Sequence, residues 1–402
     1  MANGDGAGPE RPFSVMDTGD TRMASVVASL AREPRLALDT ESNSFHSYHE
    51  KICLIQVSTP TQDYVLDPLR AGLPDTLRSL LSSEDRLLVL HGADFDVRSF
   101  KRTFHLKLGL LFDTHVAASL LGRSDLGLKA LVHAELGQEI SKDEQRSDWS
   151  RRPLSERQLE YARQDTRFLL ALAERLEEQL VSLGRLDWLK EECERLREVQ
   201  PSERVFDPEA YMRIKGARTL GARGRRVLRA AYLWREQVAD ASDVAPFRVL
   251  RNDQMIRLGV AADRDALMSS LELTASKWLP RELDRRGLVD ALEATAPPMP
   301  PAQRTPQDAT GRETWEAGSR GPGKPSGRLD EATRLRFERL AAVRNAAAAR
   351  LGLDPGFFLS NSFLRRVALA PPASLEDLAR MEGITRWRCD VVGEELLASV
   401  HL

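Results

Sequence analysis

The chain has 402 residues, of which 42% are hydrophobic and 29% charged, and its net charge is −2 at pH 7. This length is enough for two to four domains with cores of their own, and the composition is that of a soluble globular protein. No run of about eighteen apolar residues occurs, which argues against a membrane-spanning helix and a membrane partner. The three cysteines, Cys53, Cys193 and Cys389, form no CxxC pair. We therefore expect neither a disulfide framework nor a zinc site, and a reducing cytoplasmic location.

The first 200 residues alternate strand-like and helical stretches. Residues 1–22 are polar and rich in glycine, and we expect a disordered N-terminus there. Strands are expected at 35–39, 52–58, 64–67 and 86–92, and helices at 95–104, 113–121, 126–136 and across 153–200. Strands followed by helices indicate an α/β domain over residues 23–200, in which a mixed sheet is flanked by helices.

Two helical stretches follow, at residues 207–292 and 329–402, and they are separated by a linker at 293–328 that is dense in Pro and Gly. The two stretches repeat each other at a fixed offset, which pairs Arg235 with Arg344 and Leu250 with Leu359. Other matched pairs are Asn252 with Asn361, Arg257 with Arg366, and Trp278 with Trp387. The repeat predicts two small all-α helical-bundle domains, an arrangement suited to gripping a long ligand.

Charge is distributed unevenly along the chain. Residues 1–200 contain 26 basic and 33 acidic side chains, whereas residues 201–290 contain 17 and 13. The stretch 211–235 holds eight basic side chains and no acidic one. Such a stretch could neutralise phosphates, and a solvated helix face is the alternative.

Two carboxylates close the first predicted strand, in the string LALDTES at 36–42. Alternate residues of a strand share a face, so Asp39 and Glu41 point the same way. Two like charges in this position repel each other unless a cation lies between them, and hard divalent ions prefer oxygen ligands. Exposed acids at an ordinary strand end are the alternative interpretation.

Further acids follow the strand at 86–92 and lie in the helix predicted from residue 155 or 156. Asp94 and Asp96 occupy a strand-to-helix turn, where α/β folds place their sites and where a helix cap is also common. Ser155 and Gln158 have capping-box spacing. Tyr161 then lies one turn before Asp165, on one face of that helix.

Together, these carboxylates and the strings around them resemble the DEDD exonuclease family, in its tyrosine-containing subgroup, and ribonuclease D in particular. The matching strings are DTE at 39–41, IQVS at 55–58, HGADFD at 91–96, FDTHVAASLLG at 112–122, LGLKALV at 126–132 and QRSDWSRRPLSERQLEYARQDT at 145–166. The resemblance implies an RNase H-like mixed sheet. The two helical stretches resemble the helicase-and-RNase-D C-terminal (HRDC) domain.

This resemblance implies a 3′→5′ exoribonuclease in which Asp39, Glu41, Asp96 and Asp165 hold two divalent ions, Mg²⁺ or Mn²⁺. Asp39 would bridge the ions, and Asp96 fits the motif better than Asp94 because it lies five residues after His91. Tyr161 would orient the attacking water, since a hydroxyl with a pKa of about 10 is a poor base at neutral pH. The implied substrate is a single-stranded RNA 3′ end, as in tRNA precursors, and we expect a monomer.

Candidate RNA contacts lie in both halves. Near the motif strands, His91, Phe45 and Gln56 could contact terminal nucleotides, and a structural role is an equal alternative for each. The basic candidates are Lys215, Arg218, Arg223, Arg225 and Arg226. Two other functions remain open: an exonuclease that acts on DNA, because no residue of the motif reads a 2′-hydroxyl, and a nucleic-acid-binding adaptor with a vestigial nuclease fold. The complete acidic set argues against the adaptor.

Overall fold

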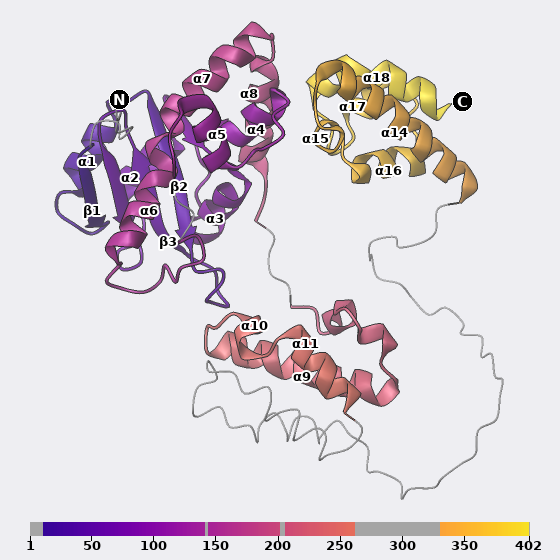
Figure 1. Ribbon diagram of the computed structural model, residues 1–402, viewed down its shortest axis with the longest axis horizontal. Coiled ribbons are helices and arrows are strands. Elements are labelled where there is room, and N and C mark those ends of the chain that lie inside the picture. Colours follow the sequence, from indigo (N-terminus) through magenta and orange to yellow (C-terminus); the bar gives the residue numbers. More distant parts are fainter. Residues whose placement is uncertain (1–10, 141–143, 202–205, 262–329, 402) are drawn as a thin grey trace, which may run out of the picture. The chain divides into compact units, whose positions relative to one another are not determined.

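The computed structural model describes residues 11–140, 144–201, 206–261 and 330–401 (Figure 1). Within these ranges, the chain forms two compact units. The first contains residues 11–43, 51–140, 144–201 and 330–401, and the second contains Ser44–Glu50 and residues 206–261. The helix expected over 262–292, the position of Trp278 and the linker at 293–328 lie outside the described residues. None of the described helices is both long enough and apolar enough to cross a membrane.

A six-stranded mixed sheet forms the centre of the first unit, with the strand order β1-β4-β3-β2-β5-β6. The strands are β1 (Phe13–Asp17), β2 (Arg35–Ser42), β3 (Ile52–Ser58), β4 (Asp63–Asp67), β5 (Leu87–Leu90) and β6 (Leu110–Asp113). β3 is antiparallel to β2 and to β4, and the other neighbours run parallel. The predicted mixed sheet is therefore confirmed. In contrast to the disorder expected up to residue 22, β1 is an edge strand that pairs with β4 and buries Met16.

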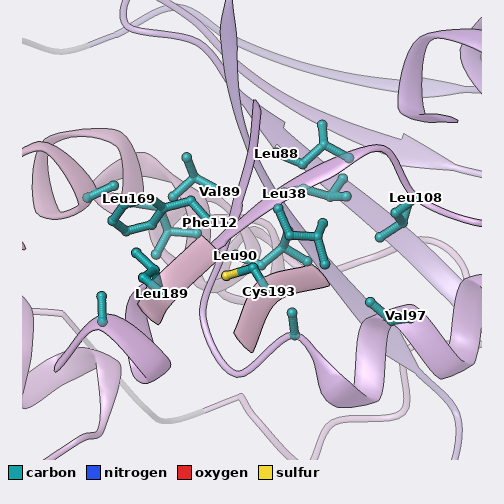
Figure 2. Packing of buried hydrophobic residues seen from close by; sticks show 14 of the residues in the cluster. Leu38, Leu88, Val89, Leu90, Val97, Leu108, Phe112, Leu169, Leu189 and Cys193 are labelled. Carbon is teal, nitrogen blue, oxygen red and sulfur yellow. The ribbon is translucent and has the colours of Figure 1, made fainter. Parts of the chain in front are cut away.

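Eight helices described within the first 200 residues surround this sheet. They are α1 (Met23–Leu30), α2 (Asp75–Ser82), α3 (Asp94–Phe104), α4 (Thr114–Leu120), α5 (Leu128–Leu136), α6 (Glu156–Arg167), α7 (Leu169–Ser182) and α8 (Leu186–Glu198). Figure 2 shows Leu38 and Leu90 of the central strands packed with Leu189 and Cys193 of α8. Because the central strands are buried on both sides, polar side chains on them are exceptional and mark the site described below.

The second helical module belongs to the same unit as the sheet. It comprises α14 (Glu331–Leu351), α15 (Pro355–Phe358), α16 (Asn361–Leu369), α17 (Leu375–Ala379) and α18 (Arg386–Val400). The start of α18 packs against α8, where the rings of Trp188 and Trp387 stack with centroids 4.4 Å apart. Beside them, Glu192 forms an ion pair with Arg388, and both side chains are buried. The Glu191 carboxylate accepts a hydrogen bond of 3.1 Å from the backbone N–H of Trp387.

A second contact of this module is a close approach of backbone to backbone. A Cβ atom placed on Gly122, which follows α4, would lie 2.0 Å from the carbonyl oxygen of Gly352. Arg185 lies next to this contact and donates hydrogen bonds to the carbonyl oxygens of Leu120 and Leu351. The second module is thus fixed to the α/β body through buried side chains and direct backbone packing.

The second unit contains the first helical module. Its elements are the 3₁₀ turns η1 (Ala210–Arg213) and η2 (Ala217–Thr219) and the helices α9 (Ala222–Ala241), α10 (Pro246–Val249) and α11 (Asn252–Val260). The segment Ser44–Glu50, which connects β2 to β3 in the chain, packs with these helices. The N–H of Ala245 donates to the His46 carbonyl at 3.1 Å, and Arg248 donates to the Phe45 carbonyl at 2.8 Å.

The sequence repeat corresponds to a repeated hydrogen-bond pattern. In the first module, Arg235 donates to the Leu250 carbonyl and to the Asn252 side chain, at 3.4 and 2.9 Å. In the second module, Arg344 makes the equivalent bonds to Leu359 and Asn361, at 3.2 and 2.7 Å. The matched arginines and asparagines therefore tie the long helix of each module to the loop before a short one.

Candidate active site

Strand β2 presents Asp39 and Glu41 to helix α6. In the antiparallel pair of β2 and β3, Asp39 lies opposite Gln56, and Glu41 lies opposite Leu54. Residues opposite each other in such a pair share a face of the sheet. Ser58, two residues after Gln56, shares this face and contacts α6, so the two carboxylates of β2 point toward α6 as well.

Helix α6 supplies two further groups of the site. Its first turn has the predicted capping box: the Ser155 hydroxyl accepts from the N–H of Gln158, and the Gln158 side chain accepts from the N–H of Ser155. The cap fixes where the helix begins, and hence its rotational phase. Tyr161 and Asp165 consequently share one face and are in hydrogen-bond contact.

Three of the four predicted carboxylates meet in one cluster. Oxygen atoms of Asp39, Glu41 and Asp165 all lie within 4.8 Å of one another. Asp96 lies beside this cluster but outside that radius. The Thr40 hydroxyl holds it with a hydrogen bond of 2.5 Å to a carboxylate oxygen. Asp94 is exposed and forms an ion pair with Arg98 at 2.8 Å, whereas Asp96 is buried.

The open edge of β2 explains how Asp96 reaches this position. β5 pairs with β2 only as far as Ala37, so within the described residues the rest of β2 has no neighbouring strand on that side. The turn after β5 leads into α3, whose first turn carries Asp96. The end of β5 and the extension of β2 past it thus bring a helix start next to the acids of β2, in the position where α/β folds place their sites.

Burial raises the pKa values of all four carboxylates, and repulsion from the neighbouring acids adds to this for Asp39 and Glu41. For Asp39 the larger cause is burial, followed by the charges of Asp96, Asp165 and Glu41. Glu41 is shifted upward for the same reasons. Burial also raises the pKa values of Asp96 and Asp165 to about 7. Four acids this close oppose ionisation of one another, so the site favours any species that adds positive charge.

Tyr161 is buried beside the acids, and its ring packs against the ring of Trp149. Burial, together with the charges of Asp165, Glu41 and Asp39, raises the pKa of its hydroxyl well above the ordinary value. The hydroxyl is therefore neutral at physiological pH and can orient a group through its hydrogen bonds. The ring of Trp149 packs against the Tyr161 ring, with centroids 6.0 Å apart. This contact gives the distinctive string around Trp149 a physical role, since it holds the tyrosine in place.

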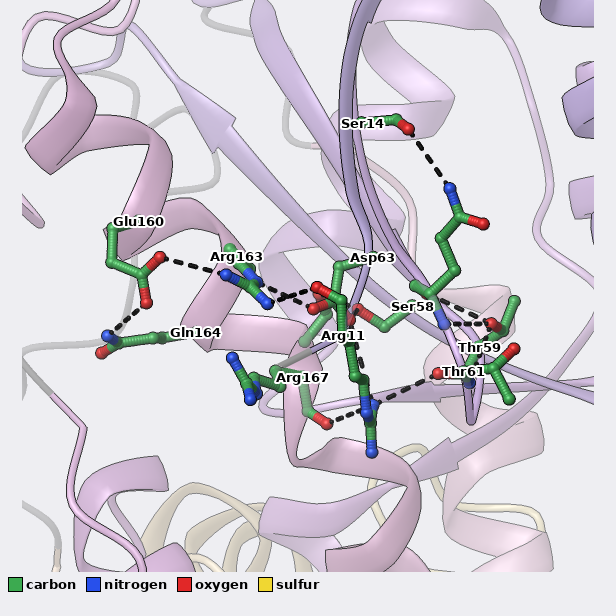
Figure 3. A network of polar contacts seen from close by, with 12 residues as sticks. Arg11, Ser14, Ser58, Thr59, Thr61, Asp63, Glu160, Arg163, Gln164 and Arg167 are labelled. Carbon is green, nitrogen blue, oxygen red and sulfur yellow. Dashed lines mark hydrogen bonds and ion pairs between the residues drawn. The ribbon is translucent and has the colours of Figure 1, made fainter. Parts of the chain in front are cut away.

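A buried ion pair anchors α6 to the sheet (Figure 3). Asp63 of β4 is 1% exposed and accepts hydrogen bonds from Arg163 at 3.0 Å and from Ser58 at 2.8 Å. The Ser58 hydroxyl also bonds to the Thr166 hydroxyl at 2.7 Å. Arg163 and Thr166 flank Asp165 in the sequence, so this network fixes the stretch of α6 that carries the site. Sequence reasoning missed it, although both residues lie in the matched string 145–166.

Gln56 is the other unexpected group. Its side chain is fully buried, and among the described residues neither its amide nitrogen nor its amide oxygen has a hydrogen-bond partner. The three clustered carboxylates and Asp96 beside them form a set of oxygen ligands suited to a hard divalent cation, and the unpaired Gln56 amide lies next to this set. The residues therefore fit the divalent metal that the resemblance implies. Because Gln56 is completely buried, it cannot touch a nucleotide as the structure stands, contrary to one of the expected alternatives.

The other candidate RNA contacts are partly or fully accessible. His91 is half-buried, with its ring nitrogen 2.9 Å from the Thr114 hydroxyl and its ring against that of His115. Phe45 is exposed. Of the five basic candidates, Lys215, Arg218, Arg223 and Arg226 are exposed and Arg225 is half-buried. Arg235 belongs to the same basic stretch but is buried and pairs with Glu236.

Comparisons with known proteins identify the domains and the family of the chain. A 3′–5′ exonuclease domain matches residues 15–181, and an HRDC domain matches residues 334–400. The ribonuclease D of Gluconacetobacter diazotrophicus is 31% identical over 400 residues, which cover 99% of this chain and 95% of that one. Among solved structures, the catalytic core of RRP6 from Trypanosoma brucei superposes with a TM-score of 0.64 at 26% identity, over 71% of this chain and 79% of that one.

The crystal structure of Escherichia coli RNase D shares the fold over 97% of this chain and 98% of its own length, with a TM-score of 0.63 at 23% identity. A mixed sheet with clustered carboxylates and a matching 3′–5′ exonuclease domain defines the class: this protein is a 3′→5′ exonuclease. The full-length match places it further. The chain belongs to the ribonuclease D family of exoribonucleases.

Proposed function

We propose that the protein shortens RNA from its 3′ end by hydrolysis that depends on two divalent metal ions. The observation that supports this most directly is the group of oxygen atoms from Asp39, Glu41 and Asp165 within 4.8 Å of one another, with Asp96 beside it. Two such ions, when bound, supply an activated water and stabilise the charge on the leaving 3′-oxygen. We assign Asp39 as the ligand shared by both ions, Glu41 and Asp165 to the first ion and Asp96 to the second.

The protein's own groups then have distinct tasks. Tyr161, held by Trp149 and neutral because its pKa is raised, orients the attacking water by hydrogen bonding. Thr40 holds Asp96 in a fixed direction. Asp63 and Arg163 keep α6 seated, so that Asp165 and Tyr161 stay in register with β2. His91 is a candidate to contact the terminal nucleotides, and the exposed Phe45 of the second unit is a candidate RNA contact.

We further propose that the first helical module binds the RNA backbone. The basic side chains proposed to contact phosphate are Lys215, Arg218, Arg223, Arg225 and Arg226. Their charge could neutralise phosphates that the acidic α/β body does not attract. Trimming of stable RNA precursors such as tRNA is the biological role that we propose from the resemblance to ribonuclease D.

The direct test compares an end-labelled single-stranded RNA and a DNA of the same sequence, each with Mn²⁺, with Mg²⁺ and with EDTA. We expect stepwise shortening of the RNA from its 3′ end with either metal and none with EDTA. The Asp39→Asn protein should lose activity by about 10⁴-fold and should remain folded, because the change removes repulsion among the acids. A folded Asp39→Asn protein with near-normal turnover would refute the metal assignment. Equal turnover of DNA would refute the RNA preference.

A further inference from the structure

We infer that Gln56 is a positioning residue of the metal site, and that its amide N–H orients Asp39 once a divalent ion is bound. This inference rests on the proposed function, because it requires that the carboxylates bind a divalent metal. Gln56 is uncharged and buried, and we do not assign it as a ligand of the metal.

The register of the sheet places Gln56 directly beside Asp39. The two residues are opposite each other across the pair of β2 and β3, so their side chains leave the same face of the sheet as neighbours. On its other side, Gln56 is opposite Val65 of β4, which is buried and apolar. Asp39 is therefore the polar group that the strand pairing sets next to the Gln56 amide.

The surroundings of Gln56 make its unpaired state informative. Ser58, two residues away on the same face, has partners in both Asp63 and Thr166. Asp63 is likewise bonded to Arg163. Among the described residues, the polar groups under α6 are thus paired at the Asp63 end, whereas the Gln56 amide at the Asp39 end is not. Buried amides in native proteins have partners as a rule, so an orphaned one next to a cluster of acids indicates a partner that arrives with a ligand.

A bound cation would provide that partner. A divalent ion held by Asp39, Glu41 and Asp165 would fix the direction of the Asp39 carboxylate, and an oxygen of that carboxylate could then accept a hydrogen bond from the Gln56 amide N–H. A hydrogen bond to a ligating carboxylate fixes its direction and raises the affinity of the site for metal, typically by about 10–100-fold.

The experiment measures Mn²⁺ binding and metal-free stability on the full-length protein. We expect Gln56→Met to weaken Mn²⁺ binding about 10-fold, as followed by the electron paramagnetic resonance signal of free Mn²⁺. In EDTA, its Tm should be unchanged or higher, because the change removes an unpaired buried amide. Gln56→Leu also removes the amide donor, but its side chain has a different shape from that of methionine. An effect shared by both variants therefore comes from loss of the hydrogen bond and not from poor packing of methionine.

The matched control is Gln254→Met. Gln254 of α11 is also buried, but its side-chain oxygen accepts a hydrogen bond of 2.8 Å from the N–H of Arg251. This variant should have a lower Tm and unchanged Mn²⁺ binding. Wild-type Mn²⁺ affinity in folded Gln56→Met or Gln56→Leu protein would overturn the inference, and so would a lower Tm in both variants without a change in Mn²⁺ binding.

The wild-type protein and Asp39→Asn separate this outcome from a failure of the proposed function. If the wild type binds no Mn²⁺, or if Asp39→Asn binds it normally, the metal site itself is wrong. If both references behave as expected while the two Gln56 variants bind Mn²⁺ normally, only the role of Gln56 is refuted.

Discussion

Two groups of carboxylates in the first unit, at the junction of α8 and α18 and at the active site, have pKa values that are shifted in opposite directions. At the junction of α8 and α18, Glu192 is 2% exposed, and burial alone would raise its pKa. The adjacent Arg388 and Arg195 outweigh burial and hold the pKa of Glu192 below its ordinary value. At the active site the pKa values of the carboxylates rise instead, because burial adds to the repulsion among them. At the junction, arginine side chains thus provide the positive charge that balances the carboxylate. At the active site, a bound cation would have to provide it.

The largest stability effect is expected from breaking the junction. Arg388→Met leaves Glu192 buried without its main partner, which should destabilise the protein by about 3–5 kcal/mol. Chemical denaturation measures this change. The double variant Glu192→Leu with Arg388→Met should recover most of the stability, because no lone charge remains. A destabilisation below about 1 kcal/mol in the single variant would show that the pair is not what fixes the second module.

At the active site, loss of the neutral Tyr161 hydroxyl should lower turnover more than it lowers RNA affinity. Tyr161→Phe keeps the ring that packs on Trp149 and removes the hydroxyl, so we expect turnover to fall by about 10²–10³-fold. RNA affinity, measured in Ca²⁺ or without metal, should change little. If affinity fell by a similar factor while turnover stayed normal, Tyr161 would instead be a residue on which the substrate stacks.

The stability of the metal-free protein should depend on pH because of the raised pKa values at the active site. The folded-state pKa values of Asp96 and Asp165 are about 7, above the unfolded values near 3.8. Groups with raised pKa values contribute stability that is present at low pH and is lost as pH rises through about 7. In EDTA, acidification from about pH 8 to 6 should therefore stabilise the protein, by about 1 kcal/mol per group.

Two controls sharpen this measurement. Asp165→Asn should show a smaller rise in stability over the same pH range, because one titrating group is gone. Glu192 has a lowered pKa, so its contribution is lost only in acid, at a pH below its unfolded value of about 4.5. A metal-free protein whose Tm falls steadily between pH 8 and 6 would contradict the repulsion inferred for the active site.

The smallest effect is expected for the basic side chains of the first module, of which Arg223 and Arg226 are exposed and Arg225 is half-buried. Charge reversal of Arg223, Arg225 and Arg226 should weaken RNA binding and flatten its salt dependence, by about 0.7 log units for each phosphate that the protein no longer neutralises. Titration of labelled RNA at several salt concentrations measures both. An unchanged slope would show that the first module is not the RNA grip. Substitution in the full-length protein is the better test, since truncation near residue 200 would also remove the partner of Glu192.

Much of the fold and of the site follows from local patterns in the sequence. Alternation along DTE and the spacing of Tyr161 and Asp165 each depend on one element, and in the structure each places its two side chains on one face. That the strand and the helix bring their acids together was implied by the family resemblance and not by either pattern. The capping box at Ser155 is likewise local. The contacts that the sequence does not predict depend on pairing between distant segments. Glu192 is one acid among several in a charged helix, and nothing near it in the sequence shows that Arg388 will bury it.

The same limit applies to the groups around the catalytic carboxylates. Thr40 is the middle residue of DTE, but the sequence does not predict its hydrogen bond to Asp96. That bond depends on β5 ending early beside β2. Gln56 was a candidate nucleotide contact because its exposure could not be known before the register of β2 and β3 placed it under α6. Side-chain type and spacing therefore predict the ligands, while strand register determines what supports them.

The contact between Gly122 and Gly352 suggests how this architecture constrains sequence change. Any side chain at position 122 would meet the Gly352 carbonyl, so even alanine acts there as a wedge between α4 and the second module. Gly122 also has a positive φ of 73°, so a side chain at this position would be strained even without the second module, and we expect glycine to persist here among relatives. The two glycines are therefore required for different reasons: Gly122 by the Gly352 carbonyl and by its own left-handed backbone, and Gly352 by its left-handed backbone alone, because a Cβ there would contact nothing within 4 Å.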